Sequence, residues 1–526
     1  MAASSHHYVV GSNDAGLPHY FVELNEQCLK EFEQYNSLCS VDEYEQLLYL
    51  LENKFLSGQV PIPPSDVIVV LLTLATASSH YKDHLIRGND PYNVGRTDIA
   101  HRCMRFLNEL LRTVHVFELH KYELFELELL RCQLFTFLDS IDPKQSTSTI
   151  SKRVRTRTNN QVSDIPFIAE ELPQSLGSPE TVNYKYISAL ETKKAVFHNP
   201  LITRVLSQSG SFWNSVAWAL SSSVDDDPVK HYCGEVWLPI IMFIFELYEL
   251  RHEYYKLHEL GGTDRLGFTQ KFIRSPLVSL FKSLSSSNIH IALCDHLFVN
   301  CGKGVGSGIA RPVYHSELNL SATYLPICKP STSFKWYKSM KLRRRILGAY
   351  YRVLADIPSS QRIKSFSEDQ SIKYMSRILL QIDKLSMFES FFLTDEISAT
   401  MHYLPLLAEH TVVQLWEDCN KTIEPTLVDN LKNLDALIDN FEDLLEGEPK
   451  VCVNDLGLLK TTGYIYTCTL VLLKCALFLH GKRLKASRLR SVIQRFIKME
   501  SESISATKRD ETYPILTPYL KTMFEL

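Results

Sequence analysis

Glycine and proline are scarce in this chain. Its 526 residues include 20 Gly and 22 Pro, which is low for an all-β or a collagen-like protein. Long apolar runs are also absent: the most apolar stretches, Trp237–Tyr248 and Thr469–Leu479, are shorter than the roughly 20 residues that cross a bilayer. The first residues are polar and hold no apolar signal segment. We therefore expect no secretion signal and no membrane partner.

Neither sign of charge dominates. The chain has 56 Lys and Arg against 60 Asp and Glu, a net charge of −4. A nearly balanced chain is not a general polyanion binder, so any contact with nucleic acid is expected from a local patch. Hydrophobic residues make up 45% and charged residues 22% of the chain, which is ordinary for a globular protein, and the length predicts two or three packed lobes.

The residues that hold metals or carry out catalysis are not arranged in a recognisable site. The 12 cysteines form no CxxC pair, and Cys468 and Cys475 lie two helical turns apart, as core residues do. Such thiols are expected to be reduced and buried, as in a cytosolic or nuclear protein. His80 and His84 have helical i,i+4 spacing, but no further ligand lies near them. With no GxSxG motif either, we predict no metal, no cofactor and no enzymatic activity.

The glycine run at 302–308, GKGVGSG, raises the alternative of a phosphate-binding loop. A P-loop needs a glycine four residues before a Gly-Lys-Ser/Thr end, so that backbone amides wrap the phosphates. Here Gly304 follows Lys303, and Leu297 occupies the place of the opening glycine. The frame of a P-loop is missing, which favours a flexible loop and predicts that the chain neither binds nor hydrolyses ATP.

Helical periodicity dominates the chain, and no sustained alternation of apolar and polar residues is present. The sequence predicts an all-α, irregular, multi-lobed protein with long flexible insertions. The expected helices are 22–38, 41–56, 64–80, 96–116, 122–138, 182–196, 200–221, 235–260, 267–284, 339–354, 372–385, 395–418, 425–445, 456–481 and 485–499. Helices 235–260 and 456–481 are apolar over most of their circumference, so either this chain or a partner must cover them on every side.

Breaks in composition divide the chain into expected domains. Residues 142–183 are rich in Ser, Thr, Asn, Gln and Pro, which predicts a disordered insertion. Residues 301–333 are rich in Gly, Pro and Ser, which predicts a flexible loop. The domains that follow are an N-terminal helical lobe at 1–141, a middle lobe at 184–300 and a C-terminal lobe at 334–526.

Cationic side chains cluster on one helical segment near the C-terminus. Leu484, Leu489 and Phe496 belong to its apolar stripe, and the opposite face is basic: Lys482, Arg483, Lys485, Arg488, Arg490, Arg495 and Lys498. Such a face either meets phosphates or is simply solvated. Our first candidates for DNA contact are Lys482, Arg488, Arg490 and Arg495. The same two alternatives apply to a smaller group, Lys338, Lys341, Arg343, Arg344 and Arg345.

Two further features indicate protein binding. The first is a set of apolar residues at coiled-coil spacing within an acidic segment: Leu427, Leu431, Leu434, Ile438, Phe441 and Leu445. A partner helix or another helix of this chain can cover them. The second is Asp66 followed by Val67, Ile68, Val69 and Val70. This run resembles a SUMO-interacting motif, which adds a strand to the edge of the modifier's sheet, but Pro63-Pro64 also makes a good start for a buried helix.

Several short strings together resemble a known family. They are HYFVEL at 19–24, NDPYN at 89–93, LELLRCQ at 127–133, YLPLLAE at 403–409 and YPI at 513–515. In this order they resemble the yeast fifth non-SMC element, a subunit of the SMC five/six chromosome-maintenance complex. None of them is a catalytic signature, so the resemblance depends on their number and order. It runs from about Tyr20 to Phe524.

The resemblance implies an all-helical, non-catalytic, nuclear and chromosome-associated subunit. It implies an obligate heterodimer with the sixth non-SMC element, contact with the SMC core and its SUMO ligase subunit, and control of the SMC ATPase and DNA loading in DNA repair. SUMO would be a further partner, and DNA would be reached mainly through the complex. The alternative from the residues alone is a stand-alone helical adaptor, which predicts helix pairs of constant length.

Overall fold

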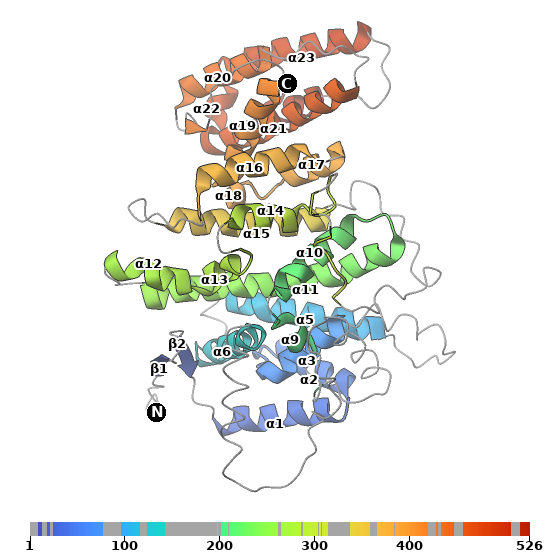
Figure 1. Cartoon of the computed structure of the whole chain (residues 1–526), viewed down its shortest axis with the longest axis vertical. Coiled ribbons are helices and arrows are strands. Elements are labelled where there is room, and N and C mark those ends of the chain that lie inside the picture. The colour runs from blue at the N-terminus through green and yellow to red at the C-terminus, as the bar shows by residue number, and fades with distance from the viewer. Residues whose placement is uncertain are drawn as a thin grey trace. The chain divides into compact units, whose positions relative to one another are not determined.

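The computed structural model describes most of the chain as helices (Figure 1). The described residues are 9–12, 18–21, 25–76, 96–115, 124–142, 197, 201–208, 210–260, 265–285, 288–302, 305–306, 308–313, 337–357, 366–382, 384–418, 428–429, 433–446, 456–506 and 516–526. The expected helix 182–196, the insertion after residue 142, His80 and His84 lie outside them. The one described sheet is an antiparallel pair, β1 (Val9–Ser12) and β2 (Pro18–Phe21), with Val9 opposite Phe21. The all-α prediction is therefore confirmed.

The chain divides into two compact units. Unit 1 comprises Met1–Leu284 and Gly308–Cys328, and unit 2 comprises Ser285–Ser307 and Lys329–Leu526. Three lobes were expected from the sequence, at 1–141, 184–300 and 334–526. Most of the first two belong to unit 1, because helices from both pack on the same long helix, and the segment expected as a flexible loop is shared between the units.

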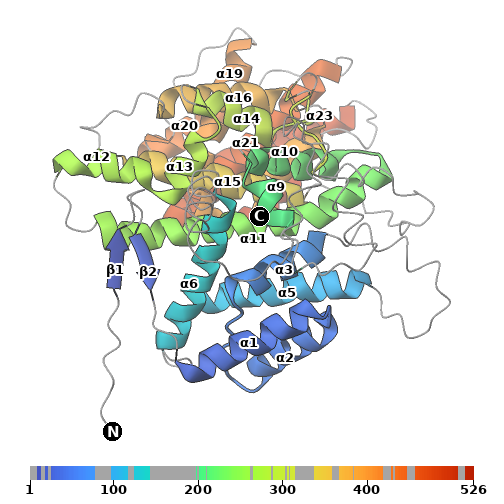
Figure 2. The same ribbon diagram turned by 60° about the horizontal axis from the view of Figure 1, so that its bottom comes forward.

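The centre of unit 1 is α11 (Pro228–Tyr255), which contacts helices from both ends of the unit. Its neighbours among the described elements are α3 (Ser65–Thr76), α5 (Arg96–His115), α6 (Leu124–Ile141), α10 (Ser211–Val224), α13 (Pro276–Lys282) and the π-helical turn η2 (Lys256–Leu260). The hairpin of α1 (Glu26–Ser40) and α2 (Tyr44–Leu56), α9 (Leu201–Leu206) and α12 (Arg265–Arg274) pack around these. Figure 2 shows α1 and α2 side by side next to α5.

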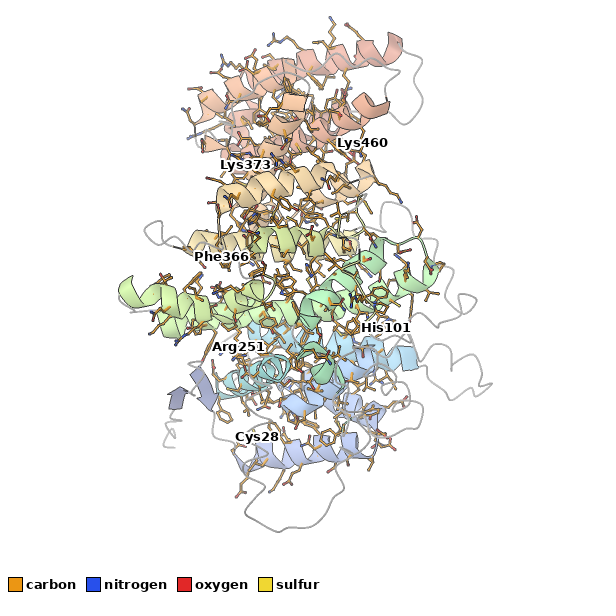
Figure 3. All side chains as sticks on the ribbon, in the orientation of Figure 1. Cys28, His101, Arg251, Phe366, Lys373 and Lys460 are labelled. Atoms are coloured by element: carbon orange, nitrogen blue, oxygen red, sulfur yellow. The ribbon has the colours of Figure 1, made fainter. Side chains whose placement is uncertain are left out.

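Local sequence explains how α11 begins and how it approaches α10. The carboxylate of Asp227 accepts hydrogen bonds from the amides of Val229 (2.8 Å) and Lys230 (3.4 Å), and Pro228 occupies the first turn, which is the usual chemistry of a helix N-terminus. Gly234 lies directly against the backbone of α10, since a Cβ there would be 2.5 Å from the Ser223 nitrogen. Farther along, Arg251 (labelled in Figure 3) forms an ion pair with Asp139 of α6.

The centre of unit 2 is α21 (Leu456–His480), packed against α17 (Leu385–Phe392), α18 (Ile397–Thr400), α19 (Leu404–Asp418) and α22 (Lys482–Lys485). The other described helices of this unit are α14 (Ile289–Leu297), α15 (Tyr337–Asp356), α16 (Glu368–Leu380), α20 (Leu434–Glu446), α23 (Leu489–Ala506) and α24 (Thr517–Phe524). Residues Lys460–His480 are long and apolar enough to cross a membrane by length and composition, but 78% of the most apolar window is buried within the protein. That burial is typical of a core helix.

Close contacts fix α21 against α17. The ring of Tyr464 stacks on Phe388 at 4.1 Å between centroids, and its hydroxyl donates to the carbonyl of Ile382. One turn earlier, the ammonium of Lys460 (labelled in Figure 3) lies 5.3 Å from the centre of the Tyr464 ring. A Cβ at Gly463 would be 2.7 Å from a methyl group of Leu385. Helices of this chain therefore cover most of α21 within unit 2.

The first part of the glycine run at 302–308 is packed where it is described. Cys301 and Val305 are buried, 2% and 5% exposed. A Cβ on Gly302 would lie 1.9 Å from the carbonyl oxygen of Gln381, and Gly306 has a φ of 61°. These glycines therefore serve close backbone packing and a left-handed turn. The segment was expected as a flexible loop, but Gly302 is held against the end of α16 and Gly306 against α14.

The contact at Gly302 predicts a loss of stability on a small substitution. Gly302→Ala must displace the backbone near Gln381, so we expect unfolding in urea to show a loss of about 2 kcal/mol or more, in the range of overpacked cores. Gly308→Ala is the matched control, because a Cβ there meets nothing within 4 Å and only its φ of 81° opposes alanine, at a cost of about 1–2 kcal/mol. Equal losses in the two variants would contradict the packing argument.

Candidate protein-interaction site

The run Val67–Val70 lies in the core of unit 1. All four residues belong to α3, and their exposed fractions are 0%, 0%, 6% and 1%. The carbonyl of Pro64 accepts the amides of Val67 (2.9 Å) and Ile68 (3.1 Å), so the helix starts where the prolines predict. Pairing with the edge of another sheet needs an extended, exposed strand. The structure offers none at these residues, and it favours the buried-helix alternative.

The predicted basic face is largely neutralised within unit 2. Arg488 forms an ion pair with Asp439 of α20, and Arg495 pairs with Glu442 of the same helix at 2.9 Å. Arg490 donates to the backbone carbonyl of Glu525 at 3.3 Å. Of our four DNA candidates, Arg488 and Arg495 form ion pairs, whereas Arg490 and Lys482 form none among the described residues. The structure brings these side chains together, but it places acids beside most of them.

The acidic segment with coiled-coil spacing is the helix that supplies those acids. In α20, the apolar residues Ile438, Phe441 and Leu445 are buried, and the helix packs on α23. Leu427 and Leu431 lie outside the described residues. An intramolecular helix therefore covers the described part of the seam, as one of the two alternatives predicted. The apolar stripe of α23 is also buried at Val492, Ile493 and Phe496, and the ring of Phe496 lies edge-on to Tyr466 of α21.

The smaller basic group contains core residues. Arg343 and Arg344 are buried on α15, 0% and 5% exposed. The guanidinium of Arg344 donates to the carbonyls of Ser390 and Phe391 (3.1 Å to the latter), in the last turn of α17. A cation at a helix C-terminus satisfies carbonyls that lack helical partners. A solvated or phosphate-binding face was expected here. Arg344 instead caps the end of α17, and the buried Arg343 donates to Ser339 of its own helix at 3.3 Å.

A buried carboxylate holds the start of α24, the last described helix. Glu500 of α23 is 6% exposed, and its two oxygens accept the amides of Leu516 (2.9 Å) and Thr517 (2.8 Å). At the other end of α24, Lys485 pairs with Glu525 at 2.7 Å. A negative group at the N-terminus and positive groups near the C-terminus both complement the helix dipole. No sequence pattern signalled this arrangement, because Glu500 and Leu516 belong to separate segments.

The described cysteines are poorly suited to catalysis or metal binding. None forms a disulfide. Burial raises the pKa of Cys39 and of Cys475 to about 12 and that of Cys132 to about 11. Because the thiolate is the nucleophile and the metal ligand, such thiols are unreactive near neutral pH. Among the residues that the structure describes, no group of three or more His, Cys, Asp or Glu is placed to hold a metal ion.

Comparison with known proteins identifies the family. Residues 1–503 match the family described as "DNA repair proteins Nse5 and Nse6". The chain is 32% identical over 438 residues to "Non-structural maintenance of chromosome element 5" of Saccharomyces cerevisiae, and the match covers 81% of this chain and 78% of that protein. This chain belongs to the Nse5 family. The resemblance read from the short strings is confirmed, and the matched region includes α21, α22 and nearly all of α23.

The burial of α3 predicts what alanine does there. Val67→Ala and Val69→Ala remove methyl groups from a packed core, so each should lower the free energy of unfolding by on the order of 1 kcal/mol or more. The matched control is Val41→Ala, the same chemical change at a residue that is 65% exposed, which should leave stability unchanged. Reduced SUMO binding by the two core variants at an unchanged melting temperature would contradict the buried assignment.

The capping of α24 predicts a local effect. Glu500→Gln keeps the size of the side chain but removes its charge, so the amides of Leu516 and Thr517 lose charge-assisted bonds worth about 1–2 kcal/mol. Hydrogen exchange at 516–526 should accelerate while α21 stays protected. Glu502→Gln, on the same helix but with 67% of its side chain exposed, is the control. Unchanged exchange in Glu500→Gln would show that this carboxylate does not hold α24.

Proposed function

We propose that this chain is a non-catalytic structural and regulatory subunit of the SMC five/six complex. It pairs with the sixth non-SMC element, and the pair controls the SMC ATPase and the loading of the complex on DNA during DNA repair. The observation that carries the proposal is the family match over residues 1–503, with 32% identity to the yeast fifth element. Its site of action is nuclear and chromosomal.

The geometry supports a protein-binding role. Most cations of the described basic face form ion pairs with acids of the same chain. DNA is therefore reached mainly through the complex. The buried thiols and the packed residues of the glycine run favour a structural role for these residues over a catalytic one. A link to SUMO through Val67–Val70 is not part of the proposal, since those residues are buried in α3. Contact with the SUMO ligase subunit of the complex remains part of it.

The stand-alone adaptor is the less favoured alternative. A regular helical-repeat protein stacks helix pairs of similar length. Here α11 has 28 residues, α21 has 25 and α18 has 4, and the chain forms two units built around single long helices. The irregular lengths favour a dedicated subunit over a repeat scaffold.

The structure also changes the expected form of the heterodimer. Helices of their own units cover α11 and, apart from its last turn, α21, the two helices that a partner would otherwise have to cover. The chain alone should therefore be a monodisperse monomer, and pairing should use surface residues. The exposed large apolar side chains of the α1–α2 hairpin are Leu29, Val41, Tyr49 and Leu56.

Purification tests the proposal. When the tagged chain is isolated from its native cell, the sixth non-SMC element and both SMC subunits should co-elute, whereas an untagged strain recovers none of them. Size exclusion with light scattering should show a one-to-one complex of the chain with the sixth element. If hydrophobic burial holds the pair, it should survive high salt, because salt screens charge pairs and not apolar contacts. A monomer that recruits none of these subunits would refute the proposal.

A further inference from the structure

The last turn of α21 leaves the core of unit 2. Most of this helix is buried, but Phe478 is 56% exposed and Leu479 is 46% exposed. The helix ends at His480, and Gly481, with a φ of 50°, turns the chain into α22. Two adjacent apolar side chains, one of them aromatic, therefore stand on the surface directly before a basic segment. Exposed apolar pairs of this kind are a common feature of binding surfaces.

Positive charge remains unpaired at the same place. Lys482 and Arg483 are exposed, and no described acidic side chain forms an ion pair with either. The cations that follow are engaged: Lys485 with Glu525, Arg488 with Asp439 and Arg495 with Glu442. We name Phe478, Leu479, Lys482 and Arg483 the α21–α22 corner. Six consecutive chain positions hold all four, at the turn that joins α21 to α22.

The nearest acid does not neutralise the corner. Glu525 already accepts a hydrogen bond from Lys485, and this bond, with the neighbouring charges of Lys485, Arg490 and Lys482, holds the pKa of its carboxyl below the usual range. One carboxylate thus lies in the field of three cations, while Arg483 adds a fourth positive charge nearby. The surface around the corner carries an excess of positive charge beside exposed apolar groups.

We propose that the α21–α22 corner binds a short acidic segment of a partner protein that carries a large apolar side chain. Carboxylates of the segment would pair with Lys482 and Arg483, and its apolar side chain would cover Phe478 and Leu479. Exposed ion pairs alone contribute about 0–1 kcal/mol each, so the apolar contact supplies much of the affinity. The charges supply orientation and select an acidic partner.

Nucleic acid fits this surface less well. A duplex binds along a row of phosphate contacts, each of which needs a cation. Here the row that α23 would provide is lined by the acids of α20, including Asp439 and Glu442, which repel a polyanion. An anionic membrane also fits less well, because a membrane-surface helix needs a broad apolar face, and the corner has two apolar side chains.

This inference goes beyond the proposed function, which names partners without naming a surface. Its first test uses the purified full-length chain and not the assembled complex. A failure to bind an acidic peptide would leave the family match and co-purification untouched. A failure of co-purification would leave the peptide measurement standing. The two outcomes are therefore distinguishable.

The test is fluorescence anisotropy with a labelled synthetic peptide of alternating glutamate and aspartate around a central leucine–phenylalanine pair. The parent chain should show saturable binding that weakens with salt. The pair Lys482→Glu with Arg483→Glu, and separately the pair Phe478→Ser with Leu479→Ser, should each weaken binding at least about tenfold, equivalent to roughly 1.4 kcal/mol. Exchanging the cations, as Lys482→Arg with Arg483→Lys, should preserve binding.

The chain offers a matched control on α23. Lys498 and Met499 are also an exposed cation beside an exposed apolar residue, with 79% of the Lys498 side chain and 59% of Met499 exposed. Lys498→Glu with Met499→Ser should bind the peptide as the parent does. Equal weakening by this control pair would overturn the assignment to the corner, because it would show a general effect of charge and hydrophobicity.

Two further probes decide the class of partner. A short DNA duplex and phosphatidylserine vesicles are measured with the same variants. Tighter binding of either probe than of the peptide, lost in the Lys482→Glu with Arg483→Glu pair, would overturn the proposal, and so would a lack of saturable peptide binding. All four side chains are exposed, so melting temperatures should match the parent. If the variant Phe478→Ser with Leu479→Ser has a lower melting temperature than the parent, the charge-reversal and charge-exchange variants alone decide the outcome.

Discussion

The structure depends on covering two long apolar helices with other helices. A helix that is apolar on all sides must find neighbours around its whole circumference, and α11 and α21 each do so within one unit. Their neighbours come from distant parts of the chain: α3 and α5 end more than 100 residues before α11 begins, and α17 ends more than 60 residues before α21 begins. The two-unit division follows from this requirement, since each unit is organised around one of these helices.

Close approach to these central helices explains several small residues. Gly234 allows α11 to meet the backbone of α10, and Gly463 allows α21 to meet Leu385. A larger residue at either place would hold the helices apart and leave voids among the aromatic side chains nearby. The packing of interiors is dense enough that such gaps cost stability. Glycine, although scarce in the chain, is therefore used where two backbones or a backbone and a side chain nearly touch.

Sequence reasoning found the helices better than their ends. Apolar periodicity predicted the central helices, because the residues on a buried helix face are apolar and recur with the period of the helix. The periodicity predicted one helix at 200–221. The structure interrupts this segment at Gly210, which has a φ of 78° and directly precedes α10. The periodicity also joined 267–284 across Pro276, where α13 begins anew. It missed α14, which is short and follows a serine-rich stretch. These ends depend on single backbone conformations that composition does not reveal.

The partners of the charged side chains were the feature that the sequence predicted least well. A basic segment looks the same in sequence whether its side chains meet water, phosphate or carboxylates of the same protein. Arg344 was expected on a surface and caps a buried helix end, because its partners at Ser390 and Phe391 lie on another helix. Arg488 and Arg495 find Asp439 and Glu442 across a segment of about fifty residues. Such pairings depend on tertiary packing, which neither spacing nor composition encodes.

The same pairings determine where the surface of unit 2 can act on another molecule. Wherever α20 runs beside α23, acids neutralise the arginines and the apolar stripe is covered, so neither charge nor hydrophobicity is left to bind a partner. Glu500 and Lys485 similarly satisfy the two ends of α24. At the turn after α21, no described acidic side chain forms an ion pair with Lys482 or Arg483, and Phe478 is 56% exposed. In a helical protein, recognition depends on side chains at helix ends of this kind, where the packing of the chain on itself is incomplete.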